Sequence, residues 1–143
     1  MRFLDRMQPL ALLALRLVLG AVMIGHGYGK VFHAGLAQHV ARVSSFGLPG
    51  WLAYCSAFTE FFGGILLIAG LFTRCVSVAV MIDMSVAIWK VHFKNGFLAK
   101  GSGYEFTLTL ATVAFALIFF GAGPIAIDAI RRGGGGVAKA KKA

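Results

Sequence analysis

Charged residues are scarce in this sequence, and acidic residues are scarcer still. Of the 143 residues, 13% are charged and only five are Asp or Glu, whereas an ordinary soluble domain is about one quarter charged. A water-soluble fold of this length needs more polar surface to cover itself, but a surface that faces lipid does not. The shortage of charge therefore argues against a soluble domain and predicts an integral membrane protein.

Cysteine is also nearly absent. Cys55 and Cys75 are the two cysteines, and no CxxC motif occurs. On one helix, twenty residues correspond to roughly 30 Å, whereas a disulfide needs Cα atoms within about 7 Å. We expect no disulfide within one chain, and cysteine gives no indication of redox chemistry.

The net charge of +9 raises the question of a nucleic-acid partner. The basic residues do not form one stripe but lie mostly at the ends of apolar segments, where cations set membrane orientation. We therefore expect no nucleic-acid binding.

Long apolar segments are what the sequence has in abundance. Four of them approach the ~20 residues that a helix needs to cross a bilayer, at about residues 9–30, 50–72, 75–93 and 104–123. The link at 73–74 is so short that its flanking helices must be antiparallel neighbours. Gly63, Gly64 and Gly70 are expected to allow close helix contact. The prediction is an all-α, four-transmembrane-helix antiparallel bundle over residues 1–130, followed by a disordered basic tail at 131–143.

Orientation follows from the distribution of lysine and arginine. One side of the predicted bundle carries eight of them, namely Arg2, Arg6, Arg74, Arg131, Arg132, Lys139, Lys141 and Lys142. The other side carries five, namely Lys30, Arg42, Lys90, Lys94 and Lys100. The positive-inside rule then places both termini in the cytoplasm.

Two charges fall within the apolar segments at similar depth. Arg16 lies roughly 10 Å and Asp83 roughly 13 Å from the cytoplasmic edge, at 1.5 Å per residue. A charge inside the bilayer needs a partner, an interior position or a function. We predict that Arg16 and Asp83 form a structural ion pair.

A second polar group lies toward the outer face. It comprises His26, Lys30, Glu60, His92, Tyr104 and Glu105. His26 and Lys30 are four residues apart and share a helix face. Such a cluster is suited to binding a polar headgroup, relaying protons or ligating a metal, although we assign no metal. The alternative is that the residues near helix ends simply reach water. His33 and His39 are interpreted as ordinary loop residues.

Several segments together resemble the DoxX family of small bacterial membrane proteins. They are RLVLGAVMIGHGYGKVF (16–32), GLPGWLAY (47–54), TEFFGGILLIAGLFTR (59–74), VHFKNGF (91–97) and GYEF (103–106). The resemblance covers about residues 10–128 and implies a four-helix bundle in the bacterial inner membrane. The family's recurring polar positions are matched by Arg16, His26, Lys30, Glu60, Arg74, His92 and Glu105, but not by Asp83.

The resemblance also implies a link to redox metabolism. We expect an accessory membrane subunit of a quinone-linked redox or thiol/oxidative-stress system, because the chain has no cofactor motif of its own and needs a partner to supply electrons. It is therefore not expected to be an independent enzyme. The cofactor stays open, with quinone as a candidate ligand that is favoured over haem. The candidate partners are membrane lipid, a soluble or membrane redox protein and a second copy of the chain. Two alternatives stay open: a non-enzymatic anchor or scaffold, and a b-type haem bundle that uses His26 and His92.

Overall fold

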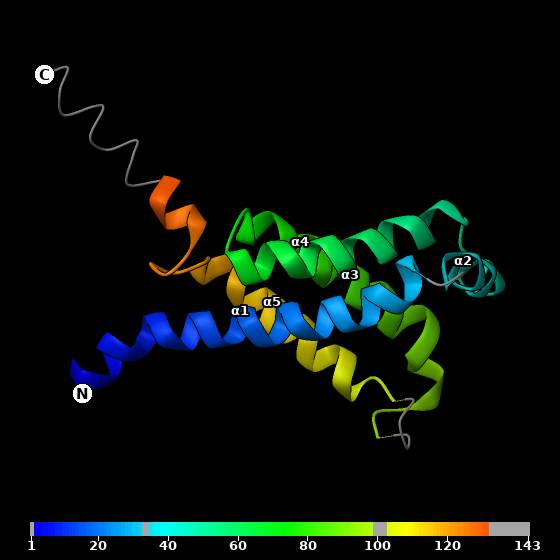
Figure 1. The fold of residues 1–143 in the computed structure, drawn as a ribbon. Helices are drawn as coiled ribbons and strands as arrows, with labels where there is room; N and C mark the ends of the chain where they lie inside the picture. Colours follow the sequence, from blue (N-terminus) through cyan, green and yellow to red (C-terminus); the bar gives the residue numbers. More distant parts are fainter. Residues whose placement is uncertain (1, 33–34, 99–102, 132–143) are drawn as a thin grey trace, which may run out of the picture.

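The computed structural model describes residues 2–32, 35–98 and 103–131, and these residues form helices and turns without any strand. In chain order the elements are α1 (Arg2–Val31), α2 (Gly35–Ser45), α3 (Trp51–Ala69), α4 (Thr73–Ala87), the π-helix η1 (Ile88–His92), the 3-10 helix η2 (Phe93–Asn95) and α5 (Glu105–Phe120), as Figure 1 shows. The all-α prediction is confirmed for the described part of the chain. The predicted tail beyond residue 131 lies outside the described residues, as do His33 and Lys100.

Three helical stretches in the described residues are long and apolar enough to cross a membrane. They are Arg6–Val31, Trp51–Ala69 and Thr73–Asn95, the last formed by α4, η1 and η2 together. The helix α5 is apolar but has only 16 residues. The membrane assignment is thus supported, whereas the fourth helix is shorter than predicted.

Two helix boundaries differ from the prediction. The helix α1 begins at Arg2 and contains Pro9, although Pro9 was expected at its first turn. Residues 35–45, which were interpreted as a loop, form α2. Leu36, Val40 and Val43 recur at the spacing of one helix face. This amphipathic pattern is shorter than a membrane span, so a search for long apolar segments does not predict the helix.

Close backbone contact joins α1 to α3. A Cβ atom built on Gly20 would lie 2.7 Å from the Gly64 carbonyl oxygen, and one built on Gly64 would lie 2.7 Å from the Gly20 carbonyl oxygen. Because both contacts are with backbone, neither helix accepts a side chain here without moving. The expectation of close helix contact at Gly64 is confirmed.

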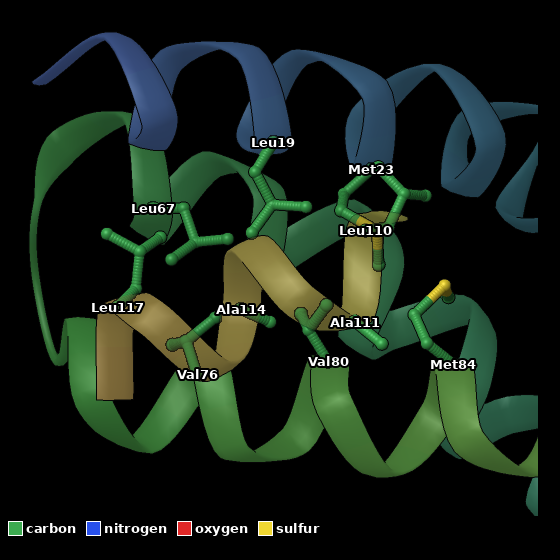
Figure 2. Close-up of a cluster of buried hydrophobic side chains, with 10 residues drawn as sticks. All are labelled: Leu19, Met23, Leu67, Val76, Val80, Met84, Leu110, Ala111, Ala114 and Leu117. Atoms are coloured by element: carbon green, nitrogen blue, oxygen red, sulfur yellow. The ribbon is translucent and has the colours of Figure 1, made fainter. Parts of the chain in front are cut away.

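The core is a layer of side chains between the helices, drawn in Figure 2. Its buried members are Leu19, Met23, Leu67, Val76, Val80, Met84, Leu110, Ala111, Ala114 and Leu117. Many larger apolar side chains, including Phe58, Phe62, Phe115 and Phe119, instead face outward. This outward apolar surface is what a bundle surrounded by lipid requires.

Arg16 is buried in this bundle, with 2% of its surface exposed. Its Nε and Nη2 donate to the carbonyl oxygens of Leu67 (3.0 Å) and Ile68 (3.1 Å). Its Nη1 donates to those of Ala122 (2.6 Å) and Ile125 (2.7 Å). The last carbonyls of a helix lack partners within that helix, so Arg16 satisfies the end of α3 and fastens it to the segment after α5.

The predicted ion pair between Arg16 and Asp83 is not present. The four side-chain hydrogen bonds of Arg16 described above go to backbone carbonyls, and Asp83 hydrogen-bonds the Ser56 hydroxyl instead. Residue count predicts how deep a side chain lies along the membrane normal, but it does not predict the direction in which the side chain points. Unsatisfied carbonyls at a helix end then provided Arg16 with a different set of partners.

Asp128, which the sequence analysis did not single out, fixes the turn between α3 and α4. Its carboxylate accepts hydrogen bonds from the backbone N–H groups of Phe72 and Thr73, both at 2.9 Å. Its own N–H donates to the Gly70 carbonyl at 2.9 Å. Partial desolvation opposes ionisation, but these backbone hydrogen bonds outweigh it and lower the pKa of Asp128. The turn holds Phe72 at a φ of 52°, a left-handed conformation that is uncommon outside glycine.

Candidate functional site

A cavity of about 610 Å3 lies among α1, α2, α3, α4, η1 and the start of α5. Met23, Met84 and Leu110 of the core layer contribute to its wall. The volume falls in the range of small-molecule sites, which are mostly apolar with a few placed polar groups. The polar side chains that line it are His26, Lys30, His39, Arg42, Ser56, Thr59, Glu60, Asp83, Lys90, His92 and Thr107.

An ion pair between α1 and α3 lies in the cavity wall. The Nζ atom of Lys30 is 2.6 Å from Oε1 and 2.5 Å from Oε2 of Glu60. The Glu60 side chain is 6% exposed and that of Lys30 is 26% exposed. Lys30 therefore pairs with a buried carboxylate instead of reaching for water, and the pair makes that carboxylate tolerable inside the bundle.

The two histidines of the predicted cluster line the cavity from different helices. His26 lies one turn before Lys30 on α1, and its ring centroid is 5.8 Å from that of Phe106 on α5. His92 closes the π-helix η1. In a continuous α-helix His92 would be about two and a half turns from Asp83 and would face away from it. The wider π turn changes this register, and both residues line the cavity.

The structure brings together four members of the predicted cluster and separates two. His26, Lys30, Glu60 and His92 line the cavity, whereas Tyr104 and Glu105 do not. The Tyr104 ring packs on Phe93 and Phe97, with centroid separations of 6.1 and 5.3 Å. Glu105 stands in the first turn of α5, where a negative charge complements the helix dipole. That the four cavity residues bind a ligand stays a prediction.

His39 and Asp83 line the cavity but were not predicted as members of the binding cluster. His39 was assigned to a loop but lies on α2, and Asp83 was assigned to an ion pair. Burial, with the nearby charges of Lys30 and Arg42, lowers the pKa of His39 to about 4. His39 is therefore neutral at pH 7. The helical spacing of Leu36, Val40 and Val43 was the signal that would have placed His39 on a helix.

Comparison with known proteins identifies the family. The family model of DoxX matches residues 11–93, from within α1 to the first residue of η2. The chain belongs to the DoxX family. The matched DoxX segment includes His26, Lys30, Glu60 and His92, and it ends before α5.

Two relatives extend the match. The chain is 32% identical over 105 residues to a Bacillus subtilis (strain 168) protein named "Putative oxidoreductase CatD", covering 73% of this chain and 76% of that protein. It is 30% identical over 131 residues to an uncharacterized protein of Haemophilus influenzae (strain ATCC 51907 / DSM 11121 / KW20 / Rd), covering 90% and 96%. No solved structure matches the chain.

Proposed function

We propose that this DoxX protein is the membrane subunit of a redox system and that its cavity binds the ring of a quinone. The observation that carries the proposal is the joining of His26, His92 and the Lys30–Glu60 pair in one largely apolar cavity. A quinone ring suits such a wall because it is flat and apolar and has two carbonyl oxygens that accept hydrogen bonds. The name of the Bacillus subtilis relative, an oxidoreductase, supports a redox role.

The chemistry assigned to this chain is proton exchange and orientation. Reduction of a quinone to a hydroquinone takes up two electrons and two protons. The electrons come from a partner protein, because the chain has no electron-carrying motif. In the proposal Lys30 donates a hydrogen bond to a quinone carbonyl, and Glu60 passes protons to the ring oxygens. A carboxylate held inside a bundle is suited to this work.

The proposal includes a location and an orientation. The chain lies in a bacterial inner membrane in contact with lipid, with both termini on the cytoplasmic side. This orientation leaves the cavity toward the outer face, where α2 covers the end of the bundle opposite the N-terminus (Figure 1).

Glu60→Gln tests the proton role, with Glu105→Gln as the matched control because Glu105 does not line the cavity. Each variant replaces the native protein in its own host, and quinone reduction is measured in isolated membranes at equal protein level. We expect Glu60→Gln to slow reduction by about 100-fold, the lower range for loss of a positioned acid or base. Glu105→Gln should keep the native rate. Unchanged turnover in Glu60→Gln would refute the role of Glu60.

The ligand itself is tested by native mass spectrometry of the protein extracted gently from its own membranes. A retained quinone or redox partner supports the proposal, and the same spectrum reports whether the chain associates with a second copy. A haem mass would favour the b-type haem alternative. A bundle that carries only lipid or a non-redox protein would favour the scaffold alternative.

A further inference from the structure

Two buried polar atoms in the cavity wall have no partner. Asp83 Oδ2 and His39 Nε2 are both inaccessible to solvent and make no hydrogen bond within the described part of the chain. They come from different elements, α4 and α2. An unsatisfied buried polar atom is costly, and native structures rarely keep one without a reason. Because Glu60 and Lys30 satisfy one another, the proton role proposed above does not account for this second pair.

The chemistry of the two atoms limits what can satisfy them. The Ser56 hydroxyl already hydrogen-bonds the Asp83 carboxyl, so the free Oδ2 requires one more donor. In its ionised form the Asp83 carboxylate only accepts, so a quinone carbonyl, which also only accepts, cannot satisfy that form. His39 is neutral at pH 7, so its Nε2 can pair with a neutral oxygen or hydroxyl.

The rest of the wall excludes two other classes of ligand. Lys30, Arg42 and Lys90 line the same cavity and disfavour a cationic ligand, although a lone carboxylate would otherwise attract one. Val43, Phe46 and Leu52 supply apolar wall, which disfavours a small, strongly hydrated molecule. Among neutral ligands, this wall favours an apolar ring that carries a hydroxyl group.

We propose that Asp83 selects for a hydroxyl-bearing aromatic ring by accepting its O–H hydrogen bond, while His39 contacts a second polar atom of the ligand. The inference rests on the proposed function in that the same cavity binds the ring. It adds that Asp83 distinguishes ligands by whether they carry an O–H donor. The hydroquinone, which has hydroxyl groups, is therefore bound more tightly than the quinone.

A matched pair of ligands tests the selection without redox chemistry. The dissociation constants of 2-naphthol and its methyl ether, 2-methoxynaphthalene, are measured for the full chain in nanodiscs, with empty nanodiscs to subtract partition into lipid. The two differ in the O–H donor. We expect the native protein to prefer 2-naphthol by about tenfold, since sites built around a hydroxyl reject the analogue that lacks it. Glu105→Gln should show the same preference.

Variants at Asp83 and His39 then show which side chain causes the preference for 2-naphthol. Asp83→Leu should bind both ligands equally. Asp83→Asn keeps a neutral acceptor and should retain part of the preference, which keeps the test valid if Asp83→Leu does not fold. His39→Leu should leave the preference for 2-naphthol over the ether unchanged, because neither ligand carries a second polar atom for His39 to contact.

Three outcomes would overturn the inference: equal affinity of the native protein for both ligands, no binding of either, or a full preference in the Asp83 variants. These results are independent of the Glu60 experiment. If Glu60→Gln slows quinone reduction but 2-naphthol is not preferred, only the selection by Asp83 fails. If 2-naphthol binding depends on Asp83 but no quinone turnover is found, only the redox role fails.

Discussion

Arg16 shows how one buried cation is held in an apolar bundle by backbone carbonyl oxygens. Four carbonyl oxygens surround its guanidinium at 2.6–3.1 Å. Two of them belong to the last turn of α3, and two belong to the irregular segment after α5. The planar, multiply donating guanidinium reaches all four at once, whereas an ammonium cannot reproduce that geometry.

We therefore predict that Arg16→Lys destabilises the bundle although the charge is kept. Loss of two or more charge-assisted hydrogen bonds should lower the free energy of unfolding by about 3 kcal/mol, measured by titration with SDS in mixed micelles. Arg74→Lys is the control, because Arg74 makes an exposed hydrogen bond to the Phe119 carbonyl at 3.1 Å. Equal stability of the two variants would contradict the role of Arg16 in fastening α3 to the segment after α5.

The charged residues also show how far the sequence could predict the site. Counting residues along each helix predicts how deep a side chain lies in the membrane. Depth alone was enough to place Lys30, Glu60 and His26 at a similar level. Counting did not give the direction of each side chain, so Arg16 was paired with Asp83 and Tyr104 was included in the cluster. Direction depends on helix rotation and on which backbone groups remain unsatisfied, and neither can be read from composition.

At the scale of the elements, the packing of α1 on α3 depends on two glycines that face each other. Gly20 and Gly64 each lie against the backbone carbonyl of the other. Gly25, also on α1, has nothing within 4 Å of a built Cβ. One helix thus contains both a glycine that the packing requires and one that it does not.

We predict opposite effects of alanine at these two positions. Gly20→Ala should destabilise the protein by about 1–3 kcal/mol, the usual cost of overpacking. Gly25→Ala should be neutral or stabilise by up to about 1 kcal/mol, because alanine favours a helix more than glycine does. Thermal unfolding in detergent measures both. Equal losses in the two variants would show that the contact between α1 and α3 is looser than described.

Two elements could not have been predicted from hydropathy. The helix α2 is short, and it packs against α1 and α3 instead of crossing the bilayer. The π turn of η1 interrupts a sequence that reads as one continuous apolar helix. Both bring unpredicted polar residues into the cavity, His39 from α2 and Lys90 from η1. The membrane spans could be predicted where apolar length alone determines the element. The site depends on α2 and η1, which apolar length does not predict.

At the scale of the whole molecule, the N-terminus and residues 127–131 lie at the same end of the bundle (Figure 1). Cys75 lies near this end, in a pocket that also includes Arg74, Asp128 and Arg131. Cys55 lines the cavity. Both cysteines are free and exposed, so the native chain carries two reporters of orientation.

We predict that a membrane-impermeant maleimide distinguishes them by side. In Cys55→Ser, Cys75 should react in inverted vesicles but not in right-side-out vesicles. In Cys75→Ser, Cys55 should react in right-side-out vesicles, where the cavity faces the reagent. Detergent-solubilised protein, in which both react, provides the reference. The reverse pattern would place the termini outside and overturn the orientation inferred from the positive charges.

The shortness of α5 has a consequence for the lipid around the protein. Sixteen helical residues span about 24 Å, less than the ~30 Å of a typical hydrocarbon layer. The chain then turns at Gly121, and Arg16 holds the carbonyls of Ala122 and Ile125. Irregular backbone is tolerated at membrane depth where protein shields it. A helix of this length matches a thinner hydrocarbon layer than α1 does, so we predict that this side of the bundle favours shorter acyl chains than the side formed by α1.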